Sequence, residues 1–322
     1  MKKLITAQSL KKHFPVYGGL FSRVVGQVKA VDDVSFEIFE GEILGLVGES
    51  GCGKTTLGRM TLRLMEPTSG KMFFKDNDIY KLKPDALAEL RPKMQIVFQD
   101  PYSSLNPRFT VEKIIGEALS VHLSLPEKKL RSEVKSLMEK VGLSPMYLNR
   151  YPHEFSGGQR QRIGIARALS LRPRYMVCDE PVSALDVSIQ AQIINLLKTL
   201  QETDNLSMLF ISHDLNVVKH LAQRTAVMYL GKIVELATTE QINKNSAHPY
   251  TQALLASKPS LDPTARNRPQ ALSGDVPSPL NPPSGCHFHP RCPHAIHRCQ
   301  TEIPRQIQLE EGHQVNCHLY DD

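Results

Sequence analysis

The chain has 322 residues, which at about 150 residues per domain predicts two domains. Its 39 Lys and Arg against 33 Asp and Glu give a formal net charge of +6, a mild surplus that does not by itself indicate a nucleic-acid partner. The sequence contains no run of about 18 apolar residues, and its opening MKKLITAQSL lacks an apolar core. We therefore expect neither a transmembrane helix nor a secretion signal, while a peripheral membrane protein stays open.

The first 235 residues alternate short apolar runs with helical patterns, as in an α/β sheet domain with an inserted helical region. Residues 31–38 alternate roughly and predict a strand. Nearly continuous apolar runs, typical of parallel strands buried on both faces, lie at 42–48, 94–98, 175–179 and 207–212. Apolar residues spaced three or four apart predict helices at 111–121, 127–141, 158–171 and 187–202.

The last part of the chain differs in composition. Ten of the 22 prolines, four of the six cysteines and six of the twelve histidines lie from Pro259 onward. This proline density disfavours long helices and sheet interiors, so we expect loops held by something other than a large core. A boundary between about 235 and 260 follows.

The segment GESGCGKTT lies between a predicted strand and a predicted helix and matches the phosphate-loop pattern. In such a loop, backbone N–H groups and the helix N-terminus bind phosphate, the lysine (Lys54) reaches the β- and γ-oxygens, and the hydroxyl of Thr55 ligates Mg²⁺. The nucleotide-binding residues predicted here are Gly48, Glu49, Ser50, Gly51, Cys52, Gly53, Lys54, Thr55 and Thr56. The loop alone leaves kinases, GTPases and ATPases open.

Two more motifs narrow this choice. Residues 155–159 read Phe-Ser-Gly-Gly-Gln before a basic amphipathic helix, and YMVCDEP (175–181) places two carboxylates at a strand end. With these motifs in this order, residues from about 4 to 240 resemble the ATP-binding cassette (ABC) family, whose signature usually begins with Leu where this chain has Phe155. The resemblance implies a P-loop NTPase fold with a RecA-like core sheet, a helical subdomain at about 100–172 and an antiparallel β subdomain.

The resemblance also implies a catalytic role for particular residues. Asp179 would hold Mg²⁺ with Thr55 and Gln99, and Glu180 would be the general base that polarises the attacking water. His213 would contact the γ-phosphate as the family's switch histidine, beside Lys54.

In this family two cassettes dimerise head to tail, so the signature of one contacts the ATP of the other. The residues implied in that contact are Ser156, Gly157, Gly158 and Gln159. Phe14 is expected to stack on the adenine, with Tyr17 and Phe21 as alternatives.

Two cysteines lie within the expected nucleotide domain. Cys52 sits near a helix N-terminus, which can lower the pKa of a thiol, so we predict that its alkylation blocks ATP binding and that bound nucleotide protects it. The alternative, favoured as regards mechanism, is that Cys52 merely fills a free position of the phosphate-loop pattern. Cys178, in an apolar strand, is expected to be inert core.

HPYTQALLASKP (248–259) and SGDVPSPLNPPSGCHFHPRCPHA (273–295) resemble the C-terminal extension of ATP-binding subunits of bacterial dipeptide and oligopeptide importers, of the second, usually last-encoded type. This implies an ABC domain at 1–240, an extension at 241–322, and an ATPase at the cytoplasmic face of the inner membrane. Its implied partners are a second ATPase subunit, two permease subunits and an extracytoplasmic solute-binding protein, with no nucleic acid. Importers of nickel, glutathione or another small solute are alternatives, and a soluble cassette ATPase acting on DNA or ribosomes is a distant one.

Four cysteines lie close together near the end of the sequence: Cys286, Cys292, Cys299 and Cys317. No Cys-x-x-Cys pair occurs among them, which disfavours a zinc ribbon, and the expected compartment disfavours disulfides. Loosely spaced thiolates in a proline-rich region suit a 4Fe–4S cluster, and the resemblance to the importer subunits implies one here. A zinc ion and unliganded thiols are the alternatives.

Overall fold

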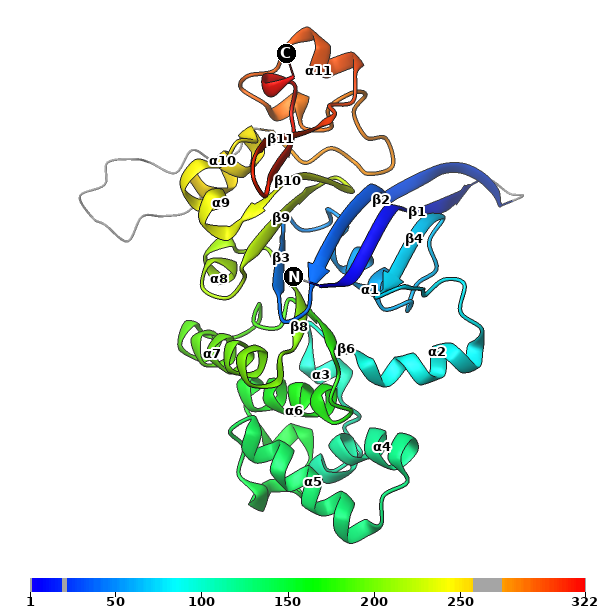
Figure 1. Ribbon diagram of the computed structural model, residues 1–322, viewed down its shortest axis with the longest axis vertical. Coiled ribbons are helices and arrows are strands. Elements are labelled where there is room, and N and C mark those ends of the chain that lie inside the picture. The colour runs from blue at the N-terminus through cyan, green and yellow to red at the C-terminus, as the bar shows by residue number, and fades with distance from the viewer. Residues whose placement is uncertain (1, 19–21, 257–273, 322) are drawn as a thin grey trace, which may run out of the picture. The chain divides into compact units, whose positions relative to one another are not determined.

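The computed structural model describes residues 2–18, 22–256 and 274–321 (Figure 1). Phe21, an alternative adenine contact, and residues 257–259 and 273 of the importer-like segments lie outside them. Packing divides the chain into two compact units. Unit 1 comprises residues 1–4, 38–43 and 74–211, and unit 2 comprises 5–37, 44–73 and 212–322.

Unit 1 contains three parallel strands, β6 (Met94–Val97), β7 (Tyr175–Asp179) and β8 (Ser207–Ser212), with β7 in the middle. Every residue of β7 and β8 is buried, which explains their nearly continuous apolar sequence. The helices of this unit are α2 (Pro84–Leu90), α3 (Pro101–Ser104), α4 (Val111–Leu123), α5 (Glu127–Lys140), α6 (Gly157–Leu169) and α7 (Val187–Asp204). Short elements are β5 (Asn77–Asp78) and 3₁₀ turns at Arg91–Lys93, Pro145–Tyr147 and Pro152–Glu154.

The helical region of unit 1 agrees with the sequence-based expectation. Helix α4 packs against α5 and α6, and fully buried Ile115, Val134 and Ile163 come from these three helices. Thr110 caps α4 by accepting a hydrogen bond from the N–H of Lys113. The four predicted helices are confirmed with ends within two residues of the observed ones.

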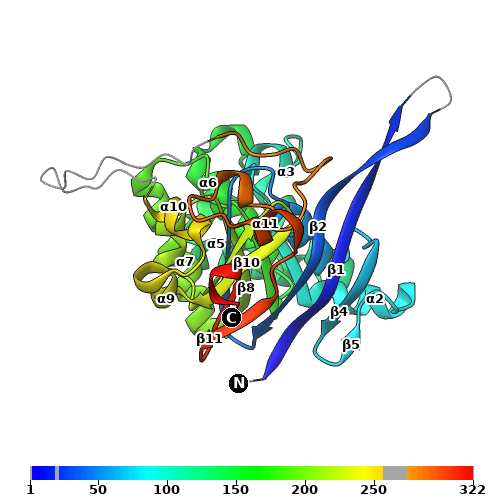
Figure 2. The same cartoon turned by 90° about the horizontal axis from the view of Figure 1, so that it is seen from above.

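Unit 2 contains two groups of strands. In the first, β1 (Lys3–Gly18) lies between β2 (Arg23–Phe39) and β4 (Ser69–Phe74), and β1 and β2 run side by side (Figures 1 and 2). In the second, β3 (Ile43–Val47) pairs in parallel with β9 (Arg224–Tyr229), which pairs antiparallel with β10 (Lys232–Thr238). The helices are α1 (Lys54–Thr61), α8 (Leu215–Lys219), α9 (Thr239–Asn245), α10 (Pro249–Ala256) and α11 (His297–Thr301), with 3₁₀ turns at His289–Arg291 and His318–Tyr320.

The C-terminal segment, defined as residues 274–321, joins this second group of strands. Strand β12 (His313–Asn316) pairs antiparallel with β10, and β11 (Gln306–Glu310) pairs with β12. Val315 of β12 is fully buried and clusters with Ala247 and Cys317. The expectation of loops alone is therefore wrong for residues 306–316. The last proline of the segment is Pro304, so residues 306–316 contain no proline that would remove a backbone donor from the two strands.

In the described parts of the chain, no helix combines the length and the apolar character needed to cross a bilayer.

Candidate nucleotide-binding site

The phosphate loop, residues Gly48–Gly53, connects β3 to α1 in unit 2. Gly53 occupies the N-cap of α1 with a φ of +105°, and a Cβ there would collide with the backbone oxygen of Ala30. Only glycine combines this left-handed conformation with so close a backbone approach. The sequence therefore forms the tight turn that a phosphate-binding helix N-terminus requires.

Lys54, the first residue of α1, lies over this loop. Its side chain is buried, and its Nζ donates hydrogen bonds to the backbone oxygens of Gly48 at 2.7 Å and Glu49 at 2.9 Å. Thr55 and Thr56 follow in the first turn of the helix and are half-buried. Ser50 and Gly51 lie exposed at the tip of the loop. The ammonium group and the helix N-terminus together favour an anion here.

The two cysteines of the expected nucleotide domain are both buried. Cys52 is 3% exposed, and burial raises its pKa despite the nearby Lys54. The prediction of a lowered pKa is therefore wrong, because desolvation of the thiolate outweighs the lysine charge and the helix end. Cys178 is fully buried in β7, which confirms its assignment to the core, and burial raises its pKa as well.

Unit 1 presents two carboxylates at the end of β7. Asp179 is buried, and Glu180 follows it with a φ of +44°, a conformation that non-glycine residues rarely adopt. The N–H of Glu180 donates to the oxygen of Ile211 at 3.1 Å. The side-chain Nε2 of Gln99 donates to Oε2 of Glu180 at 3.1 Å. The structure thus brings two of the predicted site residues, Gln99 and Glu180, into direct contact.

The signature loop, residues Ser156–Gln159, begins helix α6 with a capping box. The N–H of Gln159 donates to Oγ of Ser156 at 3.4 Å, and the N–H of Ser156 donates to Oε1 of Gln159 at 3.0 Å. Ser156 and Gly157 are exposed, whereas Gly158 is buried against Ile189. Phe155 packs edge-on against Tyr147, with ring centroids 5.8 Å apart, so it fills the apolar position that the family usually gives to leucine.

The remaining predicted contacts lie in unit 2. His213 is exposed directly after β8. Phe14 is half-buried on β1, where Nζ of Lys12 lies 5.1 Å from its ring centroid. The alternative adenine contact Tyr17 is 62% exposed on the same strand.

Two residues that the sequence interpretation did not assign to the site contact the phosphate loop. Both carboxylate oxygens of Glu49 accept hydrogen bonds from Arg291, with Nη1–Oε2 at 2.8 Å and Nη2–Oε1 at 3.1 Å. The N–H of Glu49 donates to the hydroxyl of Tyr250 at 2.9 Å. Arg291 lies 242 positions after Glu49, so no local pattern could have linked them. The sequence did hold a hint of these contacts. The segments HPYTQ (248–252) and HPRC (289–292) occur in the same chain as a phosphate loop that carries a charged residue, Glu49.

The four C-terminal cysteines lie near one another. The N–H of Cys286 donates to the backbone oxygen of Cys299 at 2.9 Å. Burial raises the pKa of Cys286 to about 11, and the charges of Cys299, Cys317 and Cys292 add to this rise. Four thiols suit a soft metal or an iron–sulfur cluster. Nevertheless, within residues 2–18, 22–256 and 274–321 no three Cys, His, Asp or Glu side chains are grouped so as to hold a metal ion.

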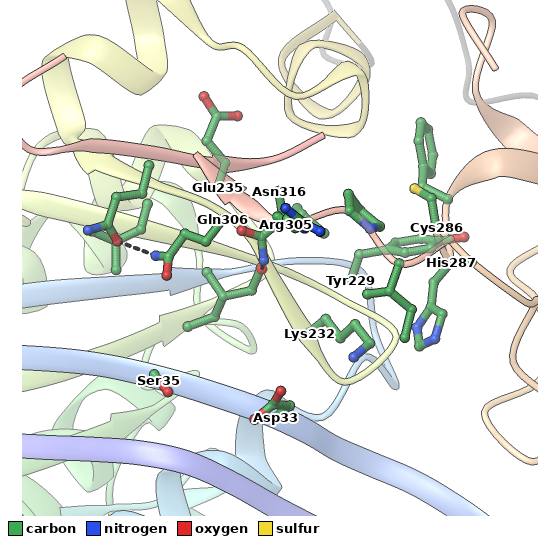
Figure 3. Close-up of a pocket in the computed structure, with 18 of the residues that line it drawn as sticks. Asp33, Ser35, Tyr229, Lys232, Glu235, Cys286, His287, Arg305, Gln306 and Asn316 are labelled. Carbon is green, nitrogen blue, oxygen red and sulfur yellow. Dashed lines mark hydrogen bonds between the residues drawn. The ribbon is translucent and has the colours of Figure 1, made fainter. Parts of the chain in front are cut away.

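A cavity of about 380 Å³ lies in unit 2 and is lined by residues of β1, β2, β9, β10 and the C-terminal segment (Figure 3). Its charged lining includes Asp33, Lys232, Glu235 and Arg305, and Cys286 borders it. No residue of the phosphate loop lines this cavity, so it is separate from the expected nucleotide position.

Comparison with known proteins relates these features to characterised families. Residues 31–183 match the ABC transporter family, and residues 234–299 match the C-terminal region of oligopeptide and dipeptide transporters. The chain is 52% identical over 320 residues to the oligopeptide transport ATP-binding protein AppF of Bacillus subtilis (strain 168), covering 98% of this chain and 97% of that protein. It is 50% identical over 318 residues to the dipeptide transport ATP-binding protein DppF of Haemophilus influenzae, covering 99% and 97%.

Solved structures show a related fold. The post-hydrolysis dimer of the ATP-binding cassette MJ0796, bound to ADP and Pi, superimposes with a TM-score of 0.65 at 26% identity. That match covers 73% of this chain and 98% of the solved one. A second dimeric structure of MJ0796, a bacterial ABC transporter cassette, gives the same TM-score at 27% identity with the same coverage.

Proposed function

The chain belongs to the ATP-binding proteins of ABC transporters, and we propose from this that it is the ATP-hydrolysing subunit of a bacterial importer of dipeptides or oligopeptides. The observation that carries the proposal is the sequence identity to two peptide-transport ATP-binding proteins, 52% and 50%. These matches extend over nearly the whole chain, including the C-terminal region. ATP and Mg²⁺ are the ligands expected of this ATPase. The division into an ABC domain at 1–240 and an extension at 241–322 is part of the proposal.

In this proposal the phosphate loop and Lys54 bind the β- and γ-phosphates of ATP. The Nζ of Lys54 already reaches the loop carbonyls, and an ATP phosphate offers it stronger, charged acceptors at the same helix end. Thr55, Gln99 and Asp179 would hold Mg²⁺, which neutralises charge on the β- and γ-oxygens when bound. The adenine is proposed to stack on Phe14, with Tyr17 and Phe21 as the alternatives.

Glu180 is proposed as the general base. Its carboxylate orients the attacking water, and its hydrogen bond with Gln99 fixes the direction in which that carboxylate points. The left-handed backbone at Glu180 is the kind of strain that persists at functional sites. His213 contacts the γ-phosphate. Hydrolysis then proceeds mainly through positioning and charge stabilisation, as phosphoryl transfer requires.

The signature loop is proposed to act on ATP bound to a second cassette. Ser156 and Gly157 are exposed at the N-terminus of α6, where N–H groups and the helix dipole suit a γ-phosphate. Gly158 and Gln159 hold this turn in place. ATP binding closes the pair of cassettes and hydrolysis resets it. Because each ATP needs the signature loop of the other cassette, an isolated chain hydrolyses ATP slowly.

The proposed assembly contains a different ATPase chain as the second cassette, two permease subunits and an extracytoplasmic solute-binding protein. In this proposal the chain lies at the cytoplasmic face of the inner membrane, bound to the permeases. Nickel, glutathione or another small solute is the alternative cargo, because solute choice is made by those partners.

Turnover in the reconstituted transporter tests the ATPase assignment. Lys54→Ala should abolish ATP binding. Glu180→Gln should retain ATP but lower turnover by about 100-fold or more, the usual contribution of a general base. Glu202→Gln, at an exposed acidic residue of α7, is the matched control and should leave turnover as in the wild type. Wild-type turnover in Glu180→Gln would refute the base assignment.

Solute-dependent stimulation tests the cargo. With the solute-binding protein encoded beside the transporter, dipeptides or oligopeptides should stimulate ATP hydrolysis and accumulate in vesicles. Stimulation by nickel or glutathione, with none by peptides, would replace the peptide assignment while leaving the ATPase intact.

We also propose that Cys286, Cys292, Cys299 and Cys317 hold a 4Fe–4S cluster with a structural role, with zinc as the alternative. The presence of four cysteines in one proline-rich segment and the preference of iron–sulfur clusters for thiolates support this. Iron, acid-labile sulfide and zinc should be measured on anaerobically purified protein. About four irons and four sulfides per chain support the cluster, one zinc supports the alternative, and neither metal refutes both.

A further inference from the structure

Glu49 is held at each of its polar groups. Its N–H donates to the hydroxyl of Tyr250, and its carboxylate accepts both hydrogen bonds from Arg291. Its backbone oxygen accepts from Nζ of Lys54 at 2.9 Å and from the N–H of Cys52 at 3.3 Å. Glu49 is therefore the residue through which Arg291 reaches the lysine that binds phosphate.

The ion pair between Arg291 and Glu49 is not an ordinary surface pair. The side chain of Arg291 is 4% exposed, whereas that of Glu49 is 24% exposed. A buried guanidinium requires a partner, and the parallel two-bond geometry fixes the carboxylate in one orientation. Hydrogen bonding to Glu49 raises the pKa of Arg291. Without Arg291, a carboxylate would stand uncompensated inside a loop that must bind an anionic nucleotide.

The C-terminal segment fixes the position of Arg291. This residue ends the 3₁₀ turn His289–Arg291, in which its N–H donates to the backbone oxygen of Phe288 at 3.0 Å. Phe288 is 1% exposed and packs against Tyr229 and Tyr250, with ring centroids 5.3 and 5.4 Å apart. The aromatic cluster of Tyr229, Tyr250 and Phe288 thus anchors both groups that contact Glu49.

We infer that Arg291 is a positioning residue of the nucleotide site: by neutralising and orienting Glu49, it keeps the phosphate loop and Lys54 in the arrangement that binds ATP. The affinity of the chain for ATP consequently depends on its C-terminal segment. This inference rests on the nucleotide binding proposed above for the phosphate loop.

The test measures the dissociation constant of Mg–ATP by titration calorimetry on the full chain. Arg291→Ala should weaken binding about tenfold, which corresponds to about 1.4 kcal/mol. Arg291→Lys keeps the positive charge but cannot form the two parallel hydrogen bonds of the guanidinium. Its affinity for Mg–ATP should therefore lie between those of Arg291→Ala and the wild type. Arg298→Ala is the matched control, because Arg298 lies in the same segment but pairs with Glu302 and Asp321; it should bind ATP within about twofold of the wild type.

A double variant separates positioning from simple anchoring. Adding Glu49→Gln to Arg291→Ala removes the uncompensated charge and should restore part of the affinity. A purely structural anchor would lower the melting temperature of Arg291→Ala without changing the affinity of the folded protein. Wild-type affinity in both Arg291 variants, or an equal loss in Arg298→Ala, would overturn the inference. Failure of the wild type to bind ATP more tightly than Lys54→Ala would instead overturn the proposed function.

Discussion

The phosphate loop and the signature loop are both glycine-containing turns that lead into a helix, but different interactions hold them. The signature loop is closed locally, by hydrogen bonds between Ser156 and Gln159. The phosphate loop has no side-chain cap at Gly53. Local hydrogen bonds from Lys54 and Cys52 reach its backbone oxygens, but its Glu49 is also held by Tyr250 and Arg291, which lie 201 and 242 positions further along the chain. A motif can therefore be complete in the sequence while the contacts that shape it are tertiary.

The largest effect that separates the two loops is expected from Gly53→Ala. A Cβ at residue 53 would meet the backbone oxygen of Ala30, which cannot move aside, and the φ of +105° is itself strained. ATP affinity should fall by about 100-fold, since strain of about 1–2 kcal/mol adds to the clash. Gly51→Ala is the control, because the φ of Gly51 is +80° but a Cβ added at residue 51 would meet no atom within 4 Å beyond its chain neighbours in the described residues. Equal affinities of the two variants would show that close approach is unimportant.

Gly158→Ala tests the close contact between the signature loop and the side chain of Ile189. The added methyl would press on the side chain of Ile189. Overpacking of this kind costs about 1–3 kcal/mol of unfolding free energy, measurable by chemical denaturation. Combining it with Ile189→Ala should recover part of the loss. If the losses of unfolding free energy of the two single variants simply added in the double variant, the assigned contact between residue 158 and Ile189 would be contradicted.

A third prediction uses pH to weaken the tertiary anchor of the phosphate loop. His248 accepts a hydrogen bond from the N–H of Tyr250 at 3.0 Å, and burial lowers its pKa from 6.5 to about 3. Because the folded protein favours the neutral imidazole, the contribution of His248 to the unfolding free energy is complete above pH 6.5 and is lost as the pH falls toward about 3. The unfolding free energy should decrease by up to about 1.4 kcal/mol per pH unit in that range, or about 2 kcal/mol at pH 5.

His248→Asn provides the matched comparison for this pH dependence. The amide oxygen can accept the hydrogen bond from Tyr250 but does not titrate in this range. Its denaturation profile should therefore be flatter between pH 7 and 5. Identical slopes for the wild type and the variant would assign the pH dependence to other groups.

The smallest effect is expected at the local cap of the signature loop. Ser156→Ala removes the acceptor for the N–H of Gln159 and should lower the unfolding free energy by about 1 kcal/mol. Ser156→Thr keeps a hydroxyl and should lose less. If both variants lost the same amount, the capping hydrogen bond would not be the cause.

The sequence predicted the elements whose determinants are local or periodic. The runs that became β7 and β8, and the spacing that became α4 to α7, encode their burial directly. The capping box at Ser156 is equally readable from residues three apart. By contrast, the pKa of Cys52 depends on burial contributed by distant segments, and the pairing of β12 with β10 joins residues about eighty positions apart. Such contacts are set by tertiary packing, which one sequence does not display.

The 3₁₀ turn at His289–Arg291 carries a consequence for the chain's response to cellular energy supply. Thermodynamic linkage is reciprocal, so if Arg291 strengthens ATP binding, ATP must stabilise this turn by the same free energy. Amide hydrogen exchange of residues 286–292 should slow when ATP binds. Cys286 and Cys292 flank the turn, so their thiols should react with oxidants more often when ATP is scarce.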